Sequence, residues 1–173
     1  NRYSLEGQPD AMALTPFLLA QKLKEEVAGI ELTTKVFFTD PSDVNDISSV
    51  RYNDELFEIP DITLGDANTF MIFDYEFLDG DPSTALTHPN CIVISDEIAK
   101  SIFGTEKAVG KTLSTWVRNY TVTGVFYSEG RPSHLSFDAA VSVSSLPENE
   151  LKMLNKDWFW LNCYTYIKVA DTV

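Results

Sequence analysis

Hydrophobic residues near the start of the chain recur at the spacing of a helix. Leucine or valine occupies every fourth position over residues 19–27, with lysine and glutamate between them, which gives a helix one apolar face. We expect Thr15 to cap this helix, Pro16 to begin its first turn and Gly29 to end it. Apolar and polar residues then alternate over 32–38, which is the pattern of a strand.

Short strand patterns and further helices fill the rest of the chain. Apolar runs bounded by turn residues predict strands at 50–52, 56–59, 62–64, 91–94, 112–117, 120–127, 137–143 and 158–169. Helical segments are predicted at 68–73, 96–103 and 146–156, and a loop at 79–82. For the helix at 96–103, Ser95 supplies the N-cap and Gly104 the stop. A helix and strand at the start, and a strand, helix and strand at the end, enclose a middle of short strands, which is typical of an α+β fold.

The charge of the chain is strongly negative and unevenly placed. The 173 residues, 44% of them hydrophobic, are enough for one domain or two small lobes, and their formal net charge is −13. Residues 40–81 contain 12 acidic residues and a single basic one, Arg51, whereas residues 101–173 are balanced. Such a surface repels phosphate backbones, so we expect no nucleic-acid partner.

Neither a membrane segment nor a disulfide framework is evident. The longest stretch without Asp, Glu, Lys or Arg is 82–95, only 14 residues, whereas a spanning helix needs roughly 18 or more. No signal peptide is visible, so the pattern fits either a cytosolic protein or the soluble part of a longer one. We expect Cys91 and Cys163 to be buried free thiols rather than a bridge.

No catalytic motif emerges from the sequence. Five residues separate Gly104 from Gly110-Lys111, where a phosphate-binding loop has four, and the segment leaves a helix rather than entering one. The histidines, His88 and His134, have no metal-ligand spacing. We expect His88 to face solvent and His134 to form structural hydrogen bonds, and a small hydrolase using His134 with a nearby Ser or Asp is a minor alternative.

The acidic segment suggests a second alternative function. Residues 40–46 loosely resemble a calcium loop, but the glycine and the distal glutamate that such a loop needs are missing. A solvated acidic face is therefore the favoured interpretation. An extracytoplasmic module that binds calcium or a cationic ligand is the alternative.

Five segments within residues 68–145 carry a family pattern. In chain order they are DYEFLDGDPSTAL, CIVISDEIAKSIFG, AVGKTL, YTVTGVF and SHLSFDAAVS. Their order and spacing resemble the periplasmic core domain of MacB-type ABC transporter permeases in the FtsX-like superfamily. The opening helix and strand and the closing strand at 158–169 also fit, so the resemblance covers nearly the whole chain.

The resemblance implies a particular division of the chain into lobes. Two β-α-β units, from residues 1–38 and 137–173, would form a membrane-proximal, porter-like lobe. Residues 39–136 would form an inserted, sabre-like lobe of short strands and mixed α/β structure. Because membrane helices would precede and follow the domain, its two termini are expected to lie close together on one face.

The resemblance also implies a non-catalytic role. The domain would lie on the periplasmic side of the inner membrane, relay ATP-driven motion in export or efflux, and need no cofactor or metal. Its partners would be the parent membrane helices, a cytoplasmic ABC ATPase reached through them, a second permease, and a periplasmic adaptor or substrate. A loop carrying Glu129, Arg131 and His134 is the expected partner contact.

Overall fold

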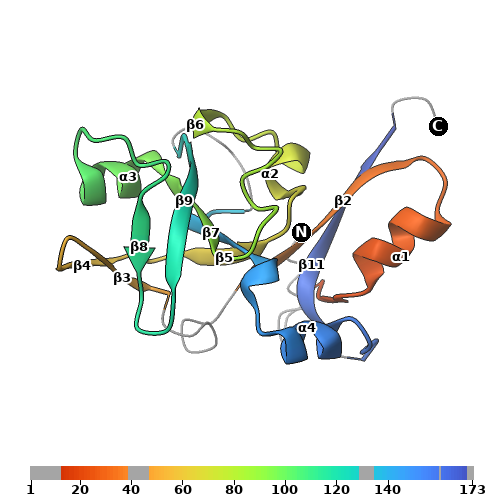
Figure 1. Ribbon diagram of the computed structural model, residues 1–173. Helices are drawn as coiled ribbons and strands as arrows, with labels where there is room; N and C mark the ends of the chain where they lie inside the picture. The colour runs from red at the N-terminus through yellow and green to blue at the C-terminus, as the bar shows by residue number, and fades with distance from the viewer. Residues whose placement is uncertain (1–12, 39–46, 129–134, 160, 171–173) are drawn as a thin grey trace, which may run out of the picture.

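The computed structural model describes residues 13–38, 47–128, 135–159 and 161–170. Its helices are α1 (Leu19–Glu26), α2 (Thr69–Ile72), α3 (Asp96–Phe103) and α4 (Glu148–Leu154), and a 3-10 turn, η1 (Val143–Ser145), precedes α4. Its strands are β1 (Thr15–Pro16), β2 (Ile30–Phe38), β3 (Ser49–Tyr52), β4 (Glu55–Glu58), β5 (Ile62–Gly65), β6 (Phe77–Gly80), β7 (Cys91–Ser95), β8 (Thr112–Ser114), β9 (Asn119–Phe126), β10 (Ala139–Ser142) and β11 (Leu161–Val169). One large mixed sheet with few helices confirms the predicted α+β class (Figure 1).

The sheet orders its strands β1-β11-β2-β5-β10-β7-β9-β8-β3-β4, and β6 pairs with β9 beside this path. Strands β10 and β5, and strands β7 and β9, are parallel. The remaining pairs are antiparallel. Strands from the two ends of the chain therefore share one sheet with strands from its middle.

Each end of the chain forms a β-α-β unit, as predicted. In the first unit, β1 and β2 are joined by α1 and lie on either side of β11, antiparallel to it and so parallel to each other. In the second, α4 joins β10 to β11, and β2 and β5 lie between these two strands. Because β5 is parallel to β10 and antiparallel to β2, β10 and β11 also run in the same direction.

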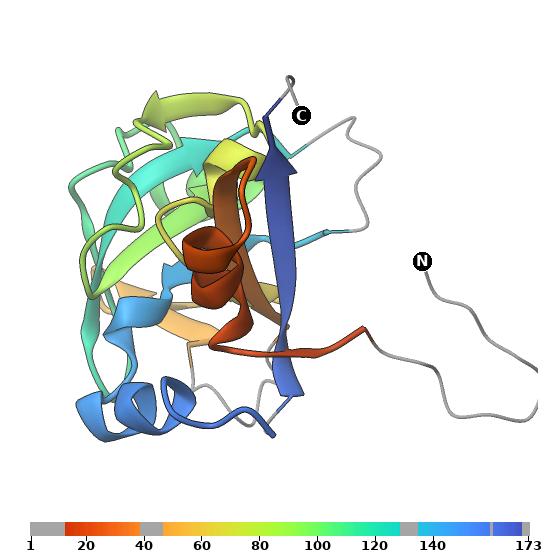
Figure 2. The same ribbon diagram turned by 90° about the vertical axis from the view of Figure 1, so that its right-hand side faces the viewer.

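The longest ladder in the sheet joins β2 and β11. It extends from Val36 opposite Tyr164 to Ile30 opposite Val169. Strand β11 starts beside α4 and runs away from it to the last described residues, as both views show (Figures 1 and 2). A single strand thus connects the α4 end of the molecule to the place where the described chain ends.

Two hydrophobic cores lie on opposite faces of the sheet, because successive residues of a strand point to opposite sides. On β7, Ile92 and Ile94 belong to the core that includes residues of α3 and α4, whereas Cys91 and Val93 belong to the core that includes α2. Rings packed edge-on or tilted fill the second core: Phe70, Tyr75, Phe77, Phe126 and Phe137. Phe70, Phe126 and Phe137 are buried there, and burying each of these rings stabilises the fold by about 1.5–3 kcal/mol.

The predicted start of the first helix is wrong. Thr15 and Pro16 form β1 instead, because the Thr15 hydroxyl donates to the Cys163 carbonyl at 2.9 Å and lies 2.7 Å from the Thr165 hydroxyl. Helix α1 begins only at Leu19, without a side-chain cap, and ends at Glu26. Gly29 is part of the following turn, with a φ of 85° that favours glycine.

Most other element boundaries lie close to the predicted ones, and β6, β8 and the start of β11 are the exceptions. The cap of α3 is confirmed, since the Ser95 hydroxyl accepts the Ile98 N–H at 3.2 Å and Gly104 follows the helix. The loop predicted at 79–82 is wrong in its first half, because β6 includes Asp79 and Gly80. Strand β8 ends at Ser114, before the predicted end, because residues 115–118 form a hydrogen-bonded turn.

Candidate interaction surface

The partner-contact loop predicted from the sequence, with Glu129, Arg131 and His134, lies outside the described residues. So do the calcium-like turn at 40–46 and the two termini, 1–12 and 171–173, whose proximity was expected. These expectations stay predictions.

The start of that loop is anchored by Asp96 in the first turn of α3. Its Oδ1 accepts hydrogen bonds from the Ser128 N–H at 2.9 Å and from the Ser128 hydroxyl at 2.7 Å. Partial burial alone would raise the pKa of Asp96, but the bonds from Ser128 outweigh it and lower the pKa. Ser128, which follows β9 and is the last described residue before the loop, is therefore held against the first turn of α3.

The glycine-lysine motif has no phosphate-binding geometry. Gly104 ends α3, and Gly110 has a φ of 90° in the turn before β8. The Lys111 ammonium lies 3.1 Å from the Glu106 carboxylate on the exposed surface. The motif therefore directs the chain from a helix into a strand. His88 is exposed, as predicted.

The cysteines have the environment of structural thiols. Cys91 and Cys163 are both free and buried, as predicted. Burial raises the pKa of Cys163, although hydrogen bonds with Thr15 and Thr165 and the charge of Lys35 act the other way. A buried thiol held in its protonated form is a poor nucleophile.

Acidic residues of the described chain do not converge on a metal site. No group of three or more His, Cys, Asp or Glu residues within residues 13–38, 47–128, 135–159 and 161–170 is placed to hold a metal ion. The acids of 47–81 are mostly exposed on separate strands and turns. Over the same described segments, no helix is long and apolar enough to cross a membrane.

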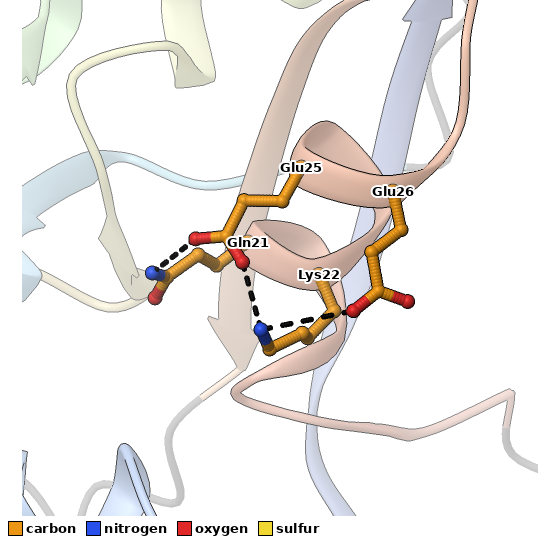
Figure 3. Close-up of polar contacts among 4 residues, drawn as sticks. All are labelled: Gln21, Lys22, Glu25 and Glu26. Atoms are coloured by element: carbon orange, nitrogen blue, oxygen red, sulfur yellow. Dashed lines mark hydrogen bonds and ion pairs between the residues drawn. The ribbon is translucent and has the colours of Figure 1, made fainter.

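The outer face of α1 is polar, and its side chains form ion pairs and hydrogen bonds with one another. The Lys22 ammonium lies 2.8 Å from Glu25 and 3.7 Å from Glu26, and the Gln21 amide donates to Glu25 at 2.7 Å (Figure 3). The hydrogen bond and charge of Glu25 raise the pKa of Lys22, and Lys22 lowers the pKa of Glu25. This face therefore offers little apolar surface to a partner.

Apolar side chains gather instead between α4 and the start of β11, in a region that we call the α4–β11 tip (residues 152–159 and 161). Met153 is 55% exposed, Trp158 46%, Phe159 94% and Leu161 51%. Backbone N–H groups of residues 156 and 157 bond to the Met153 carbonyl, and the Asp157 carboxylate accepts the Phe159 N–H at 2.7 Å. These bonds hold the backbone of the turn that carries Trp158 and Phe159.

A shallow hollow of about 450 Å³ lies at this tip. Its lining residues are Lys152, Met153, Lys156, Asp157, Trp158 and Phe159. Leu154 points the other way and is buried in the core, which fixes the helix that forms one wall. The hollow thus combines an apolar lining with three charged side chains.

A second exposed patch lies on β3, β4 and the β8–β9 turn. The Arg51 guanidinium lies over the Trp116 ring, 5.0 Å from its centre, and Leu56 is opposite Arg51 on the neighbouring strand. Trp116 is 71% exposed. Within the described part of the chain, the single base of the acidic segment therefore lies over an aromatic ring.

The sequence did not reveal either patch. The alternation at 158–169 predicted a strand beginning at Trp158, whereas β11 begins at Leu161. The first aromatic residues of that run are therefore outside the sheet and exposed. Three consecutive aromatic residues at 158–160 next to two lysines were the available signal.

The fold is similar to those of three solved domains of other proteins. A domain of a protein described as a permease, from Porphyromonas gingivalis, is 22% identical with a TM-score of 0.74, covering 94% of this chain and 71% of that one. The periplasmic region of MacB from Actinobacillus actinomycetemcomitans is 16% identical with a TM-score of 0.66, covering 99% of this chain and 73% of that one. The extracellular domain of the noncanonic ABC-type transporter YknZ from Gram-positive bacteria is 16% identical with a TM-score of 0.51, covering 86% and 70%.

These comparisons first define a class of fold, the mixed α+β domain that the three solved structures share with this chain. No curated protein sequence matched the chain. The sequence profile of the MacB-like periplasmic core domain matches residues 4–173, and the chain belongs to that family. It is accordingly a periplasmic, non-catalytic permease domain on the extracytoplasmic side of a membrane protein, as the sequence resemblance implied.

Proposed function

We propose that this domain relays ATP-driven motion of a MacB/FtsX-type permease to a substrate or partner outside the cytoplasm, in export or efflux. The observation that carries the proposal is the course of β11. This strand leads from the α4–β11 tip to the last described residues, beyond which a membrane helix would follow.

The hydrogen-bond ladder of β11 suits it to transmit force. It pairs with β2 over most of its length and with β1 near its start. A force directed along β11 is shared by all of these hydrogen bonds at once, instead of breaking them one at a time. The strand therefore moves together with the sheet. Displacement of a membrane helix would thus shift the whole domain instead of unravelling its end.

The two-lobe division extends this proposal to the whole chain. Residues 1–38 and 137–173 would form the porter-like lobe beside the membrane, supported by the two β-α-β units that share β11. Residues 39–136 would form the inserted, sabre-like lobe, supported by the short strands β3, β4, β6 and β8.

The partners follow from the same role. ATP hydrolysis would occur on a cytoplasmic ABC ATPase, fused or separate, connected to this domain through permease helices in the inner membrane. A second permease copy would complete the transporter, and a periplasmic adaptor or the substrate would contact the domain.

An insertion that uncouples the domain tests the proposal. In the intact transporter, a flexible linker of about six Gly and Ser residues after Ala170 should abolish transport while the ATPase keeps hydrolysing ATP, because a random-coil linker does not transmit a push or pull. The same linker in the exposed β3–β4 turn, between Asn53 and Asp54, is the control and should leave transport intact. Unchanged transport with the linker after Ala170 would contradict the relay.

A further inference from the structure

We propose that the open edge of β4 (residues 55–58) binds an extended, cationic segment of a partner protein as an additional strand of the sheet. The inference rests on the proposed function, since it names the kind of partner that the moving domain would contact. It adds the place of contact, the way in which the partner binds and the sequence pattern of the bound segment.

Strand β4 is the last strand at one end of the sheet. Within the described residues it pairs with β3 on one side and with no strand on the other. Strands β3 and β4 lie at one side of the molecule, far from β11 (Figure 1). The backbone N–H and C=O groups along such an edge are a template for pairing with another chain. The edge therefore offers hydrogen bonds that the described strands leave unused.

The register of the hairpin defines which residues of β4 face the open side. The Ile59 N–H donates to the Ser48 carbonyl at 2.8 Å, so the backbone of Ile59 is directed towards the strand before it. Hydrogen-bonding residues alternate along an antiparallel pair, so the residues two and four positions before Ile59 bond towards β3 in the same way. The backbone groups of Leu56 and Glu58 therefore point to the open side.

The hairpin that carries this edge is held in place by the core. Val50 is fully buried, and Phe57, which lies opposite it, packs against the same core. The Tyr52 ring contacts the Phe103 ring of α3, with the ring centres 4.7 Å apart. The two turn residues, 53 and 54, have φ values of 51° and 67°, as in a type I′ turn. Strand β4 is thus already extended, which reduces the entropy lost when a strand is added.

The charge beside the open edge is negative. The hairpin contains three exposed acids, Asp54, Glu55 and Glu58, and none of them forms an ion pair within the described residues. Its single base, Arg51, has its guanidinium over the ring of Trp116, which follows β8 on the other side of β3. Three acids thus stand against one base, and the positive charge lies away from the open edge.

The bases of the neighbouring elements have partners of their own. The Lys111 ammonium, 5.9 Å from the centre of the Tyr52 ring, lies 3.1 Å from the Glu106 carboxylate. The Arg118 guanidinium, in the β8–β9 turn, donates to the Ser145 carbonyl. Neither base neutralises the acids of the hairpin, so a cationic segment is attracted to this edge.

The order of side chains on β4 indicates which sequence fits beside it. Residues opposite each other on neighbouring strands share a face and interact in pairs. Along β4 an acid, two apolar residues and an acid follow one another: Glu55, Leu56, Phe57 and Glu58. The complementary segment is basic, apolar, apolar and basic. Because the pattern of β4 is the same in both directions, this segment fits as an antiparallel or a parallel strand.

The same charges disfavour other occupants. A second copy of this chain would bring the acids of two hairpins together, and like charges on neighbouring strands are destabilising. A membrane surface with anionic lipids would be repelled in the same way, and it attracts basic rather than acidic segments. An extended cationic segment of another protein is therefore the occupant that the edge favours.

Photo-crosslinking in the intact transporter in cells tests the place of contact. The residue p-benzoylphenylalanine would replace Leu56, which is 54% exposed, and Leu78, which is 55% exposed on β6, is the control position. The expected result is a crosslink from position 56 to a protein segment with Lys or Arg flanking apolar residues, mapped by mass spectrometry. A crosslink to lipid, to a second copy of this chain, equally from position 78, or to nothing would overturn the inference.

Backbone methylation distinguishes strand pairing from simple attraction of charges. A synthetic peptide of the mapped segment should bind the 173-residue chain and shift the NMR amide signals of residues 55–58. N-methyl groups on the alternate peptide amides that face β4 should weaken binding at least about tenfold, because each removes a donor and separates the strands. The same groups moved by one residue face away from β4 and should have little effect. Equal effects of the two placements would contradict strand addition.

Charge reversal tests the choice of occupant. The double substitution Glu55→Lys and Glu58→Lys should weaken peptide binding by about tenfold, with recovery when the basic residues of the peptide become glutamate. The control is Glu148→Lys with Glu150→Lys, at exposed acids of α4, which changes the net charge equally and should have little effect. Urea unfolding checks that each variant is folded. Equal weakening by both double substitutions would show that the overall charge, not the β4 edge, attracts the peptide.

These results are separable from those of the linker experiment. Transport lost with the linker after Ala170, but no crosslink at position 56, would reject the docking edge and keep the relay. A crosslink at position 56 with transport unchanged by that linker would reject the relay and keep the docking edge. The control linker between Asn53 and Asp54 lengthens only the turn, so β4 stays paired with β3 and its open edge remains.

Discussion

A single carboxylate shows that the acids of this chain are not all solvent-facing. Asp66, at the end of β5, accepts hydrogen bonds from the Thr34 hydroxyl at 2.6 Å and the Asn68 N–H at 3.0 Å through Oδ1, and from the Lys35 N–H at 3.2 Å through Oδ2. The Thr34 hydroxyl lies fully buried. The Asp66 carboxylate thus connects β2, β5 and the start of α2. Without a hydrogen-bond partner, the buried Thr34 hydroxyl would reduce the stability of the fold by about 1–3 kcal/mol.

Asp96 provides a prediction at the same scale. Because hydrogen bonds from Ser128 lower its pKa below the ordinary value of 3.8, the folded state is stabilised above that pH and loses the contribution as the pH falls through the lowered pKa. We expect Asp96→Asn to reduce the free energy of unfolding at pH 7 by about 0.5–1.5 kcal/mol. The difference from wild type should shrink below the ordinary pKa, as measured by urea unfolding from pH 7 to pH 3.

A neighbouring acid supplies the control. Glu97 is exposed in the same first turn of α3 and has no side-chain bond among the hydrogen bonds of the described residues. Glu97→Gln should change stability by less than Asp96→Asn, since it alters only the interaction with the helix dipole. Equal effects of the two substitutions, or a pH-independent effect of Asp96→Asn, would show that the bonds to Ser128 are not responsible.

At the scale of the element, predictions succeeded where all determinants are local. Helix α3 has its cap, Ser95, and its terminating Gly104 within its own sequence. Thr15 and Pro16 carry an equally good local signal for a helix start, yet Thr15 pairs with Cys163, 148 positions away, and Pro16 pairs with Leu161. A pattern read along the chain does not contain the distant strand that competes for Thr15.

The candidate interaction surface was missed for a similar reason. The alternation through Trp158 and Phe159 is typical of a strand, but both residues precede β11 and no described strand pairs with them. Their exposure depends on where the neighbouring β1 ends, which is a property of the sheet. The predicted contact loop with Glu129, Arg131 and His134 stays a prediction.

The close contact of β6 with β9 gives a prediction at the element scale. Glycine at 124 leaves room for the Phe77 ring, which would collide with any added Cβ, and that ring packs on Phe70 with centres 5.0 Å apart. We expect Gly124→Ala to destabilise the chain by about 1–3 kcal/mol, because the ring has to move within a packed core. Chemical denaturation measures the change.

A compensating substitution makes this prediction specific. Phe77→Leu removes the ring atoms that a Cβ at position 124 would meet. In the Phe77→Leu protein, Gly124→Ala should reduce the free energy of unfolding clearly less than it does in wild type. If the two substitutions are simply additive, the collision with Phe77 is not the cause.

For the whole molecule, the excess of acids predicts a response to salt. The net charge of −13 creates repulsion that destabilises the compact state, and salt screens exposed charges beyond about 10 Å at 0.1 M. Raising sodium chloride from 0.01 to 0.3 M should therefore increase the free energy of unfolding by up to about 1 kcal/mol. Urea unfolding at several salt concentrations measures this dependence.

The acidic hairpin β3–β4 contains the matched variant. Glu55 and Glu58 are exposed, and the double substitution Glu55→Lys and Glu58→Lys changes the net charge from −13 to −9. This variant should respond less to salt than wild type. A stability that falls with salt, or the same response in both proteins, would argue against charge repulsion.

The distant pairing of the first and last strands has a consequence for biosynthesis. Thr15 and Cys163 are 148 positions apart in the sequence, and β2 pairs along one edge with β11. Strands β1 and β2 therefore cannot pair with β11 until the final residues of the chain have been synthesised. Contacts between distant residues form slowly, and an unpaired strand edge is prone to aggregate meanwhile. While the chain is being synthesised, β2 therefore stays open to mispairing until residues 161–169 emerge, and protection of that edge by a chaperone would matter most in this interval.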